Sequence, residues 1–360
     1  MGKKLQHSFI SALTVSILSS IFPSETIATT YLDEWQEDNN NSIFSSSSGK
    51  AYYPTIIKES ASSYKMWYTG SGGIFYATSS DGTSWADGNG GSALTGLTNP
   101  HHVVVRYDGG KYKIWYWDYS QLYSINSIRY AESSDGITWT NDQAVTQNAS
   151  KPIITGTSGD WNRGSYGPSD VILNPSASNS GSNPWNYSYV MYYDATTGGN
   201  QDIGLAYSSN GLSWSRYGSS NSEGLVLEHS GTEWDATHVG RSSIYKDADG
   251  DFHMWYSGGD GRVDNGIGYA TSSNGIDWVR YPQSGSNTIF SVDDNVAWRT
   301  SRTYTPVVID GEEMWFTGDD GSNRTIGYAT TVPEPLALGL VTSTAILFLG
   351  LRRFMLTRGI

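Results

Sequence analysis

Apolar and polar residues alternate with a period of two through most of this chain, in short segments separated by turns rich in Gly, Ser and Asn. Residues 111–116, Lys-Tyr-Lys-Ile-Trp-Tyr, are typical of these segments. Such alternation, combined with many aromatic residues, predicts strands that bury one face. We therefore expect the chain from about residue 50 to residue 331 to be all-β.

A longer pattern repeats five times along the same region. Each copy has a strand with two adjacent aromatic residues, then a Gly-Tyr-Ala-Thr-like strand; in the first four copies a Ser-Ser-Asp/Asn-Gly turn and a Trp follow. The aromatic strands contain Met66, Ile114, Met191, Met254 and Met314. A short apolar strand precedes each copy, at residues 53–57, 102–105, 170–173, 243–245 and 306–309. Five units of this kind predict a five-bladed β-propeller whose first strands line a central channel.

The fifth repeat ends at Thr330, before its turn and its Trp. A closed propeller leaves no unpaired sheet edge, so another segment must complete this blade. We expect the missing strand to come from the N-terminal part of the body, near Tyr31 to Trp35 or near Ile43.

The N-terminus is typical of a secretory signal peptide, which we assign to residues 1–28. Lys3 and Lys4 precede an apolar run from Phe9 to Phe22, and small residues extend to Ala28. This is the order of a charged region, an apolar region and a cleavage site. The run is short for a membrane span, although an uncleaved anchor is the alternative.

Residues 332–360 contain a second targeting signal. Val-Pro-Glu-Pro at 332–335 precedes an apolar segment from Leu336 to Leu351, and Arg352 and Arg353 follow it. This arrangement predicts a transmembrane helix with a cytoplasmic C-terminus. The segment resembles the PEP-CTERM sorting signal, and the resemblance implies an exosortase-type processing protease as a partner. An ordinary C-terminal anchor is the alternative. In either case the body, residues 29–331, is expected outside the cytoplasm at the cell surface.

The amino-acid composition excludes several classes of partner and ligand. With 22 Lys and Arg against 35 Asp and Glu, the net charge is −13, which disfavours nucleic acid as a partner. The chain has no Cys, so thiolate metal sites and disulfides are excluded. No cofactor is expected. Its 14 Trp and 25 Tyr residues suit strand packing, and exposed aromatic rings also suit sugar binding.

The repeated pattern resembles that of five-bladed propeller glycosidases, such as arabinanases, β-xylosidases and invertase-type enzymes. The resemblance covers about residues 50–331, and it implies catalytic carboxylates where the channel-lining strands begin. Hydrolysis needs one protonated and one ionised carboxyl group on either side of the glycosidic bond. Only Asp170 occupies such a position, because the first two blades begin without an acid. Asp118 and Asp194, which follow aromatic strands, are the candidate partners. For all three, a structural hydrogen bond is the alternative role.

A second candidate group is basic. Trp161, Trp234 and Trp298 each lie ten residues before an apolar strand residue, and basic residues recur within that frame. Arginine can bind a carboxylate or sulfate with two hydrogen bonds, so an acidic sugar would fit such a group. The candidate substrate-binding residues are His101, His102, Arg163, His238, Arg241, Arg302 and Tyr304. The competing role for Arg241 and Arg302 is to neutralise buried carboxylates.

Two other chemistries have weaker support. His101, His102 and His238 come from two blades but lack the spacing of a zinc motif, so no metal is predicted. Arg163, Arg241 and Arg302 could form a sialidase-like triad, but five repeats are fewer than a sialidase has. The sequence therefore predicts an exported, glycosidase-like propeller that acts on or binds a polysaccharide or oligosaccharide. The alternative is a non-catalytic carbohydrate-binding or extracellular-matrix propeller.

Overall fold

The structure is a computed structural model of the whole chain. It describes residues 35–38, 41–47, 49–121, 128–147, 151–152, 161, 164–197, 199–218, 224–261, 263–281, 288–293 and 295–331. Residues Glu37–Thr330 form one compact unit. The predicted signal peptide and the predicted sorting helix lie outside the described residues. Within the described part of the chain, no helix is long and apolar enough to cross a membrane.

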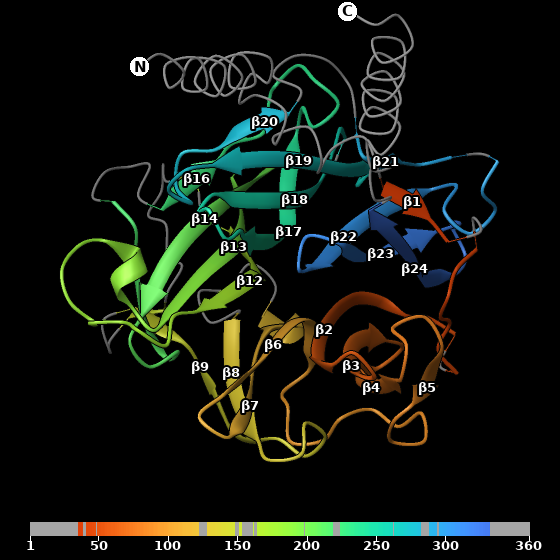
Figure 1. Cartoon of the computed structure of the whole chain (residues 1–360), viewed down its shortest axis with the longest axis horizontal. Coiled ribbons are helices and arrows are strands. Elements are labelled where there is room, and N and C mark those ends of the chain that lie inside the picture. The colour runs from red at the N-terminus through yellow and green to blue at the C-terminus, as the bar shows by residue number, and fades with distance from the viewer. Residues whose placement is uncertain are drawn as a thin grey trace, which may run out of the picture. The chain divides into compact units, whose positions relative to one another are not determined.

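The described residues are all-β, as the alternation predicts, and their strands form five successive antiparallel sets (Figure 1). The first is β2 (Tyr52–Ser60), β3 (Ser63–Gly70), β4 (Gly73–Ser79) and β5 (Trp85–Asp87). The second is β6 (Pro100–Asp108), β7 (Lys111–Asp118), β8 (Ile128–Ser133) and β9 (Thr140–Ala144). The third is β12 (Gly164–Leu173), β13 (Tyr189–Thr197), β14 (Asn200–Ser208) and β15 (Ser213–Arg216).

The last two sets complete the series. The fourth is β17 (His238–Lys246), β18 (Phe252–Gly259), β19 (Gly266–Ser272) and β20 (Val279–Tyr281); the fifth is β22 (Arg302–Ile309), β23 (Glu313–Asp319), β24 (Arg324–Thr331) and β1 (Trp35–Glu37). Short strands extend the third and fourth sets: β10 (Thr146–Gln147), β11 (Lys151–Pro152), β16 (Leu225–Leu227) and β21 (Phe290–Ser291). A single parallel pairing of Gln201 with His238 joins these two sets into one sheet.

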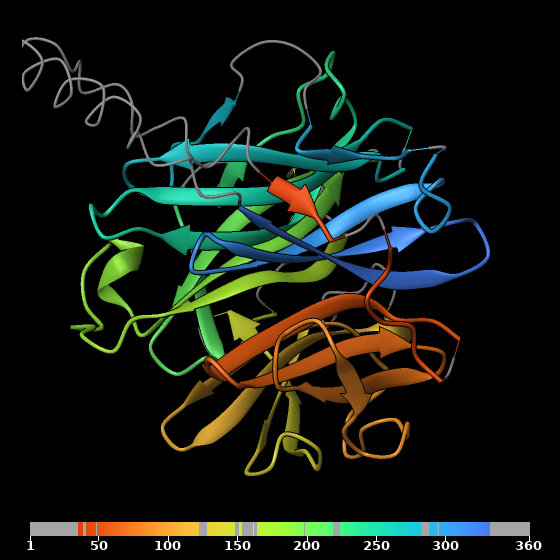
Figure 2. The same ribbon diagram turned by 45° about the vertical axis from the view of Figure 1, so that its right-hand side comes forward.

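The first strand of every set contacts the first strands of its neighbours. β2 contacts β6, β6 contacts β12, β12 contacts β17, β17 contacts β22, and β22 contacts β2. In both views the blue strands of the fifth set lie between the cyan fourth set and the orange first set (Figures 1 and 2). The five first strands are therefore the inner strands. Each sheet continues outward from its inner strand.

The chain segment before the first set completes the fifth sheet. The Asp38 amide donates to the Tyr328 carbonyl at 2.9 Å, and Phe44 forms an antiparallel bridge with Ile326. Because the fifth repeat has no fourth strand of its own, this pairing covers the edge that β24 would otherwise expose. The incomplete repeat in the sequence predicts this contribution.

The repeated Trp and Gly residues lock neighbouring sets together. The indole N–H of Trp67 donates to the Gly136 carbonyl at 2.7 Å, in the turn of the next set. Trp115 and Trp315 donate in the same way to the carbonyls of Gly211 and Gly82, at 2.8 and 2.7 Å. Gly136 has φ +77°, and a Cβ there would lie 2.8 Å from the Trp67 ring. The Asp/Asn-Gly turn is thus a socket for the preceding indole.

The three aligned Trp residues have a packing role as well. Trp161 stacks on Tyr193, Trp234 stacks on Tyr256, and Trp298 packs on Phe316, with ring centroids 5.5–5.9 Å apart. Each indole also lies over a glycine of the third strand of its sheet: Gly204, Gly268 and Gly327. A Cβ on any of these glycines would come within 2.6 Å of the ring, so the Ile-Gly pattern makes room for the loop Trp.

Candidate functional site

A strained residue recurs near the start of the inner strands. Tyr53, His102, Arg241 and Thr305 have φ between 46 and 54°, and Gly167 takes the corresponding place in β12 with φ 151°. Each lies at a register shift of its strand. The other non-Gly residues of the described chain with positive φ are all Asn or Asp, which tolerate it. Bulky residues held this way cost about 1–3 kcal/mol each and cluster at functional sites.

A neighbouring set holds each strained amide. The N–H groups of Tyr53, His102 and Thr305 donate to the hydroxyls of Thr317, Thr69 and Ser257, at 3.2, 3.1 and 2.7 Å. The Arg241 amide donates instead to Oδ1 of Asp194, at 2.8 Å. Asp194 therefore stands where three other sets use a hydroxyl. A hydroxyl would be enough to accept this hydrogen bond, so the connection does not require a carboxyl group.

The strained residues gather several polar and aromatic side chains at one end of the inner strands. We call this group the mouth cluster. It consists of Tyr53, His101, His102, Arg241, Asp264, Arg302, Tyr304 and Arg324. The Arg241 guanidinium is its centre, since the guanidinium carbon lies 5.3 Å from the Tyr53 ring centroid and 5.9 Å from that of Tyr304. Cation–π contacts of this length attract the guanidinium to both rings.

Asp264 neutralises the arginines of the mouth cluster. It pairs closely with Arg241, accepts from His238 Nε2 at 3.2 Å, and lies 3.8 Å from Arg302. Burial by itself would raise the pKa of Asp264, but Arg241, His238 and Arg302 outweigh burial and lower it to about 2. The group is therefore an anion at any physiological pH. Arg241 and Arg302 take the neutralising role that the sequence left open.

The two adjacent histidines are neutral members of the cluster. Burial, assisted by Arg324 and Arg241, lowers the pKa of His101 to about 4. Burial also lowers the pKa of His102 well below its ordinary value. His101 Nε2 hydrogen-bonds the Tyr52 hydroxyl at 3.0 Å. The rings of His101 and His102 pack 5.5 and 4.8 Å from the Tyr53 ring, so this side of the cluster is aromatic and uncharged.

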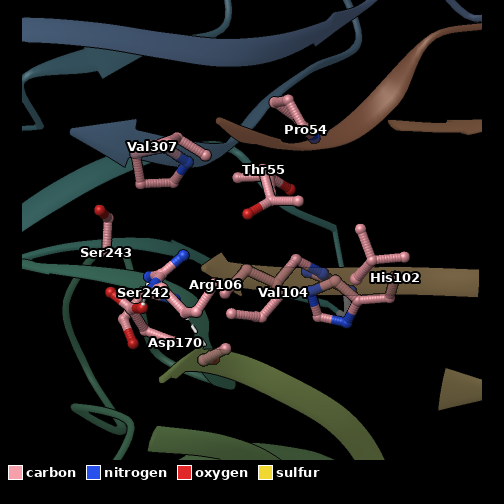
Figure 3. A pocket seen from close by; sticks show the side chains of 14 residues that line it. Pro54, Thr55, His102, Val104, Arg106, Asp170, Ser242, Ser243 and Val307 are labelled. Carbon is pink, nitrogen blue, oxygen red and sulfur yellow. Dashed lines mark hydrogen bonds and ion pairs between the residues drawn. The ribbon is translucent and has the colours of Figure 1, made fainter. Parts of the chain in front are cut away.

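Asp170 lies deeper, in the channel between the inner strands, where it bridges three sets. Its Oδ1 pairs with Arg106 of β6 and accepts from its neighbour Val171 N at 2.7 Å, and Oδ2 accepts from Ile244 N of β17 at 2.8 Å. Figure 3 shows Asp170 and Arg106 next to each other in the wall of a small cavity. This cavity measures about 30 Å³, the share of one water molecule in the liquid, and excludes a sugar.

Asp194 is buried beside the mouth cluster, with 1 % of its surface exposed. Oδ1 accepts from Ser169 and from the Arg241 amide, whereas Oδ2 has no hydrogen-bond partner among the described residues. Burial raises the pKa of Asp194 to about 6, against the opposing pull of Arg241. A group with this pKa exchanges its proton near neutral pH, as a general acid must.

Among the described residues, no hydrogen bond or ion pair links the Asp118 side chain to the mouth cluster. Its Oδ1 accepts from the amide and the hydroxyl of Ser120, at 3.0 and 2.5 Å, so it caps the turn after β7. It is 1 % exposed. This hydrogen-bonding role is the structural alternative that the sequence analysis gave for Asp118.

The mouth cluster brings together most of the predicted substrate-binding residues: His101, His102, Arg241, Arg302 and Tyr304, with His238 bound to Asp264. Arg163 lies outside the described residues. No group of three His, Asp or Glu side chains suited to a metal occurs in the part of the chain that the structure describes.

Sequence reasoning missed Asp264 and Arg324, and it named Tyr53 only as a strand start. Asp264 lies in the loop between β18 and β19, and Arg324 begins β24. Such loops join the second and third strands at the end where the inner strand begins. Charged residues in the loops between the second and third strands are therefore the signal that would have identified both.

The fold has relatives among solved structures. The chain is similar to a member of the GH130 family of mannoside phosphorylases and glycoside hydrolases, at 12% identity and TM-score 0.59, with 88% of this chain and 99% of that chain covered. It is also similar to a thermostable family-43 glycoside hydrolase at 16% identity and TM-score 0.55, covering 79% and 95%. A GH43 endo-arabinanase from Bacillus licheniformis shares 18% identity with TM-score 0.52, covering 78% and 93%.

No protein-family model and no curated protein matches the chain. At these identities the structural likeness establishes the fold, which is that of propeller glycosidases, while activity has to be argued from the site.

Proposed function

We propose that this protein is a glycosidase-like propeller that binds a polysaccharide through the mouth cluster. The observation that carries the proposal is that arginine and aromatic side chains of the cluster are partly exposed, whereas the carboxyl groups are buried. The side chains of Arg302 and Arg324 are 34 and 31 % exposed, and Tyr53 and His101 are partly exposed. Partly exposed guanidinium groups beside aromatic rings suit sugar hydroxyls, carboxylates and ring faces.

The carboxyl groups that hydrolysis would need are buried. Asp118, Asp170, Asp194 and Asp264 are between 1 and 3 % exposed. Asp118, Asp170 and Asp264 each accept hydrogen bonds from neighbouring groups, and of the four only Asp194 has a buried oxygen without a partner among the described residues. A sugar at the mouth would touch arginine and aromatic side chains before any of these acids. This arrangement favours binding over turnover.

Hydrolysis is the second candidate, and one observation favours it. The pKa of Asp194 is raised to about 6, while that of nearby Asp264 is lowered to about 2. Two carboxyl groups whose pKa values are pushed apart are the pattern of an acid paired with a base. Catalysis would require the mouth to open enough for Asp194 to reach the glycosidic oxygen.

The proposal includes the cell address and the architecture. The body, residues 29–331, would be a closed five-bladed propeller, exported by the signal peptide at 1–28. Residues 332–360 would hold it in the membrane until an exosortase-type protease cuts near the Pro-Glu-Pro motif. This order of segments in the sequence supports a role at the cell surface, where polysaccharides are the abundant polymers.

The test uses the full-length protein in a detergent without a sugar headgroup. It is incubated with neutral and acidic polysaccharides, and retention and newly formed reducing ends are read from the same samples. Retention that falls in Arg302→Gln but not in Lys111→Gln, an exposed cation outside the mouth cluster, supports binding at the mouth. Release that disappears in Asp194→Asn establishes hydrolysis. Neither retention nor release on any polymer would overturn the proposal.

A further inference from the structure

The third set differs from the other four at the end opposite the mouth. Inner strands begin at the mouth, so the turn after each one lies at the far end. Three of the other turns have two or three residues, and the turn between β17 and β18 has five. The connection from β12 to β13 instead runs from residue 174 to residue 188 and contains a 3-10 helix, η2 (Pro184–Asn186). In Figure 1 it is the lime-green loop at the left edge.

Hydrogen bonds within this long connection hold it in a defined conformation. Asn174 Nδ2 donates to the Trp185 carbonyl at 2.6 Å, and the Asn183 side chain accepts from the Trp185 amide at 3.0 Å to cap η2. Asn179 exchanges hydrogen bonds with Ser188 at 3.0 and 3.1 Å. Side-chain caps of this kind fix a loop in one conformation. The position of Trp185 is therefore set by the loop itself.

Trp185 is also fixed from the neighbouring set. Its indole N–H donates to the Asn274 carbonyl at 2.7 Å, and its ring lies 4.5 Å from the Phe252 ring. Asn274 belongs to the turn after β19. In the first, second and fifth sets the strand Trp bonds the glycine carbonyl of the neighbouring turn. Here the strand residue is Tyr192, whose hydroxyl bonds the Gly275 carbonyl, while the Trp185 ring lies over Gly275. The loop indole takes part of the strand indole's place at the outer rim.

A cavity of about 530 Å³ opens beside this indole. Its walls include the rings of Trp185, Tyr207 and Tyr217, with Asn183, Asn274 and Ile276 between them. Every described residue that lines it is uncharged. Its volume is within the range of about 300–1,000 Å³ that small-molecule sites occupy. An uncharged aromatic pocket with amide groups recognises ligands by ring contact and hydrogen bonds, without ion pairing.

We propose that this pocket is a second carbohydrate site, which binds a neutral oligosaccharide. The aromatic rings offer faces for the C–H side of a sugar ring, and the Asn183 amide N–H group and the Ser182 hydroxyl offer hydrogen bonds to its hydroxyls. The absence of charge from the described lining sets it apart from the mouth cluster. The two sites lie at opposite ends of the inner strands, so one molecule can hold two polymer segments.

The test measures binding of neutral oligosaccharides to the full-length protein by calorimetry, in a detergent without a sugar headgroup. The panel contains arabinan, xylan and mannan fragments of two to six units. Tyr217→Ala removes one aromatic wall, and Tyr217→Phe is the matched control that keeps the ring. Ser182→Arg adds a long, charged side chain to the lining of the pocket. Thermal unfolding of each variant checks that it is folded.

The expected result is a loss of affinity of roughly tenfold or more in Tyr217→Ala and Ser182→Arg, with Tyr217→Phe close to wild type. Lys111→Gln, outside both sites, should leave this binding unchanged, and Arg302→Gln reports binding at the mouth separately. The inference fails if no neutral oligosaccharide binds. It also fails if binding survives both pocket variants or is lost in Arg302→Gln alone.

Discussion

The channel and the mouth of this domain each contain a buried aspartate from the third set, and the two differ in what surrounds them. Asp170, in the channel, has a partner for both oxygens and connects β6, β12 and β17. Asp194, beside the mouth cluster, has partners for Oδ1, while Oδ2 has none among the described residues. The exposed fractions of Asp170 and Asp194 are nearly equal, at 3 and 1 %.

The comparison shows that burial of an acid does not identify a site. A carboxylate whose two oxygens both have partners supports the fold, because moving it would leave several groups unsatisfied. A carboxyl group with an unpaired oxygen and a raised pKa can still exchange a proton with a ligand. The sequence favoured Asp170, but the contacts make Asp194 the better candidate for chemistry.

Asp170→Ala should give the largest effect. It leaves the Arg106 guanidinium and the amides of Val171 and Ile244 without their acceptor, so we expect a loss of about 3–5 kcal/mol in the free energy of unfolding. Urea titration followed by Trp fluorescence measures it. Ser243→Ala, which removes one acceptor from Val308 N, is the control and should cost about 1 kcal/mol. Equal losses would contradict the bridging role.

Asp194 should make stability fall as the pH rises. Its pKa is about 6 in the folded protein and ordinary, about 3.8, in the unfolded chain, so the folded state holds the proton more tightly. Its contribution is complete below pH 4 and is lost as the pH rises through 6, a change of roughly 3 kcal/mol.

Asp194→Asn tests this pH dependence. The difference in unfolding free energy between wild type and variant, measured at steps from pH 4 to pH 7, should follow the titration of one group. A constant difference across that range would show that Asp194 has an ordinary pKa.

Asp194→Thr sharpens the comparison between the third set and its neighbours. Thr69 and Thr317 bind strained amides with a hydroxyl, so Thr at position 194 should keep the bond from the Arg241 amide. We expect its stability at pH 7 to lie within about 1 kcal/mol of wild type, whereas Asp194→Ala should lose about 2 kcal/mol. Thermal unfolding ranks the three proteins. Equal losses for Thr and Ala would show that the hydrogen bond from the Arg241 amide to residue 194 does not contribute to stability.

Arg302→Gln should have the smallest effect on stability. Its side chain is 34 % exposed and 3.8 Å from Asp264, which keeps Arg241 and His238 as partners, so the loss should be below about 1 kcal/mol. Retention on acidic polysaccharides should nevertheless fall. Chromatography at increasing salt measures this, because contacts through an exposed cation weaken with ionic strength. Unchanged retention would place sugar binding away from this residue.

The sequence by itself determined the strands, the five repeats and the contribution of the N-terminal segment to the last sheet. These follow from local pattern: alternation buries one face of each strand, and Asn/Asp-Gly fits a tight turn. The residues Arg241, Arg302, His102 and Tyr304 could also be placed near one end, because each lies at a strand start whose direction the repeat fixes.

Only the tertiary structure decided which of these side chains are partners. Asp264 reaches Arg241 from the loop between β18 and β19 of the same set, and Tyr53 reaches it from more than 180 positions earlier in the chain. The pocket at Trp185 likewise depends on a loop of the third set meeting a turn of the fourth. Local pattern fixes the direction of a side chain. The partner it meets, and so its charge and pKa, depends on contacts between residues far apart in sequence.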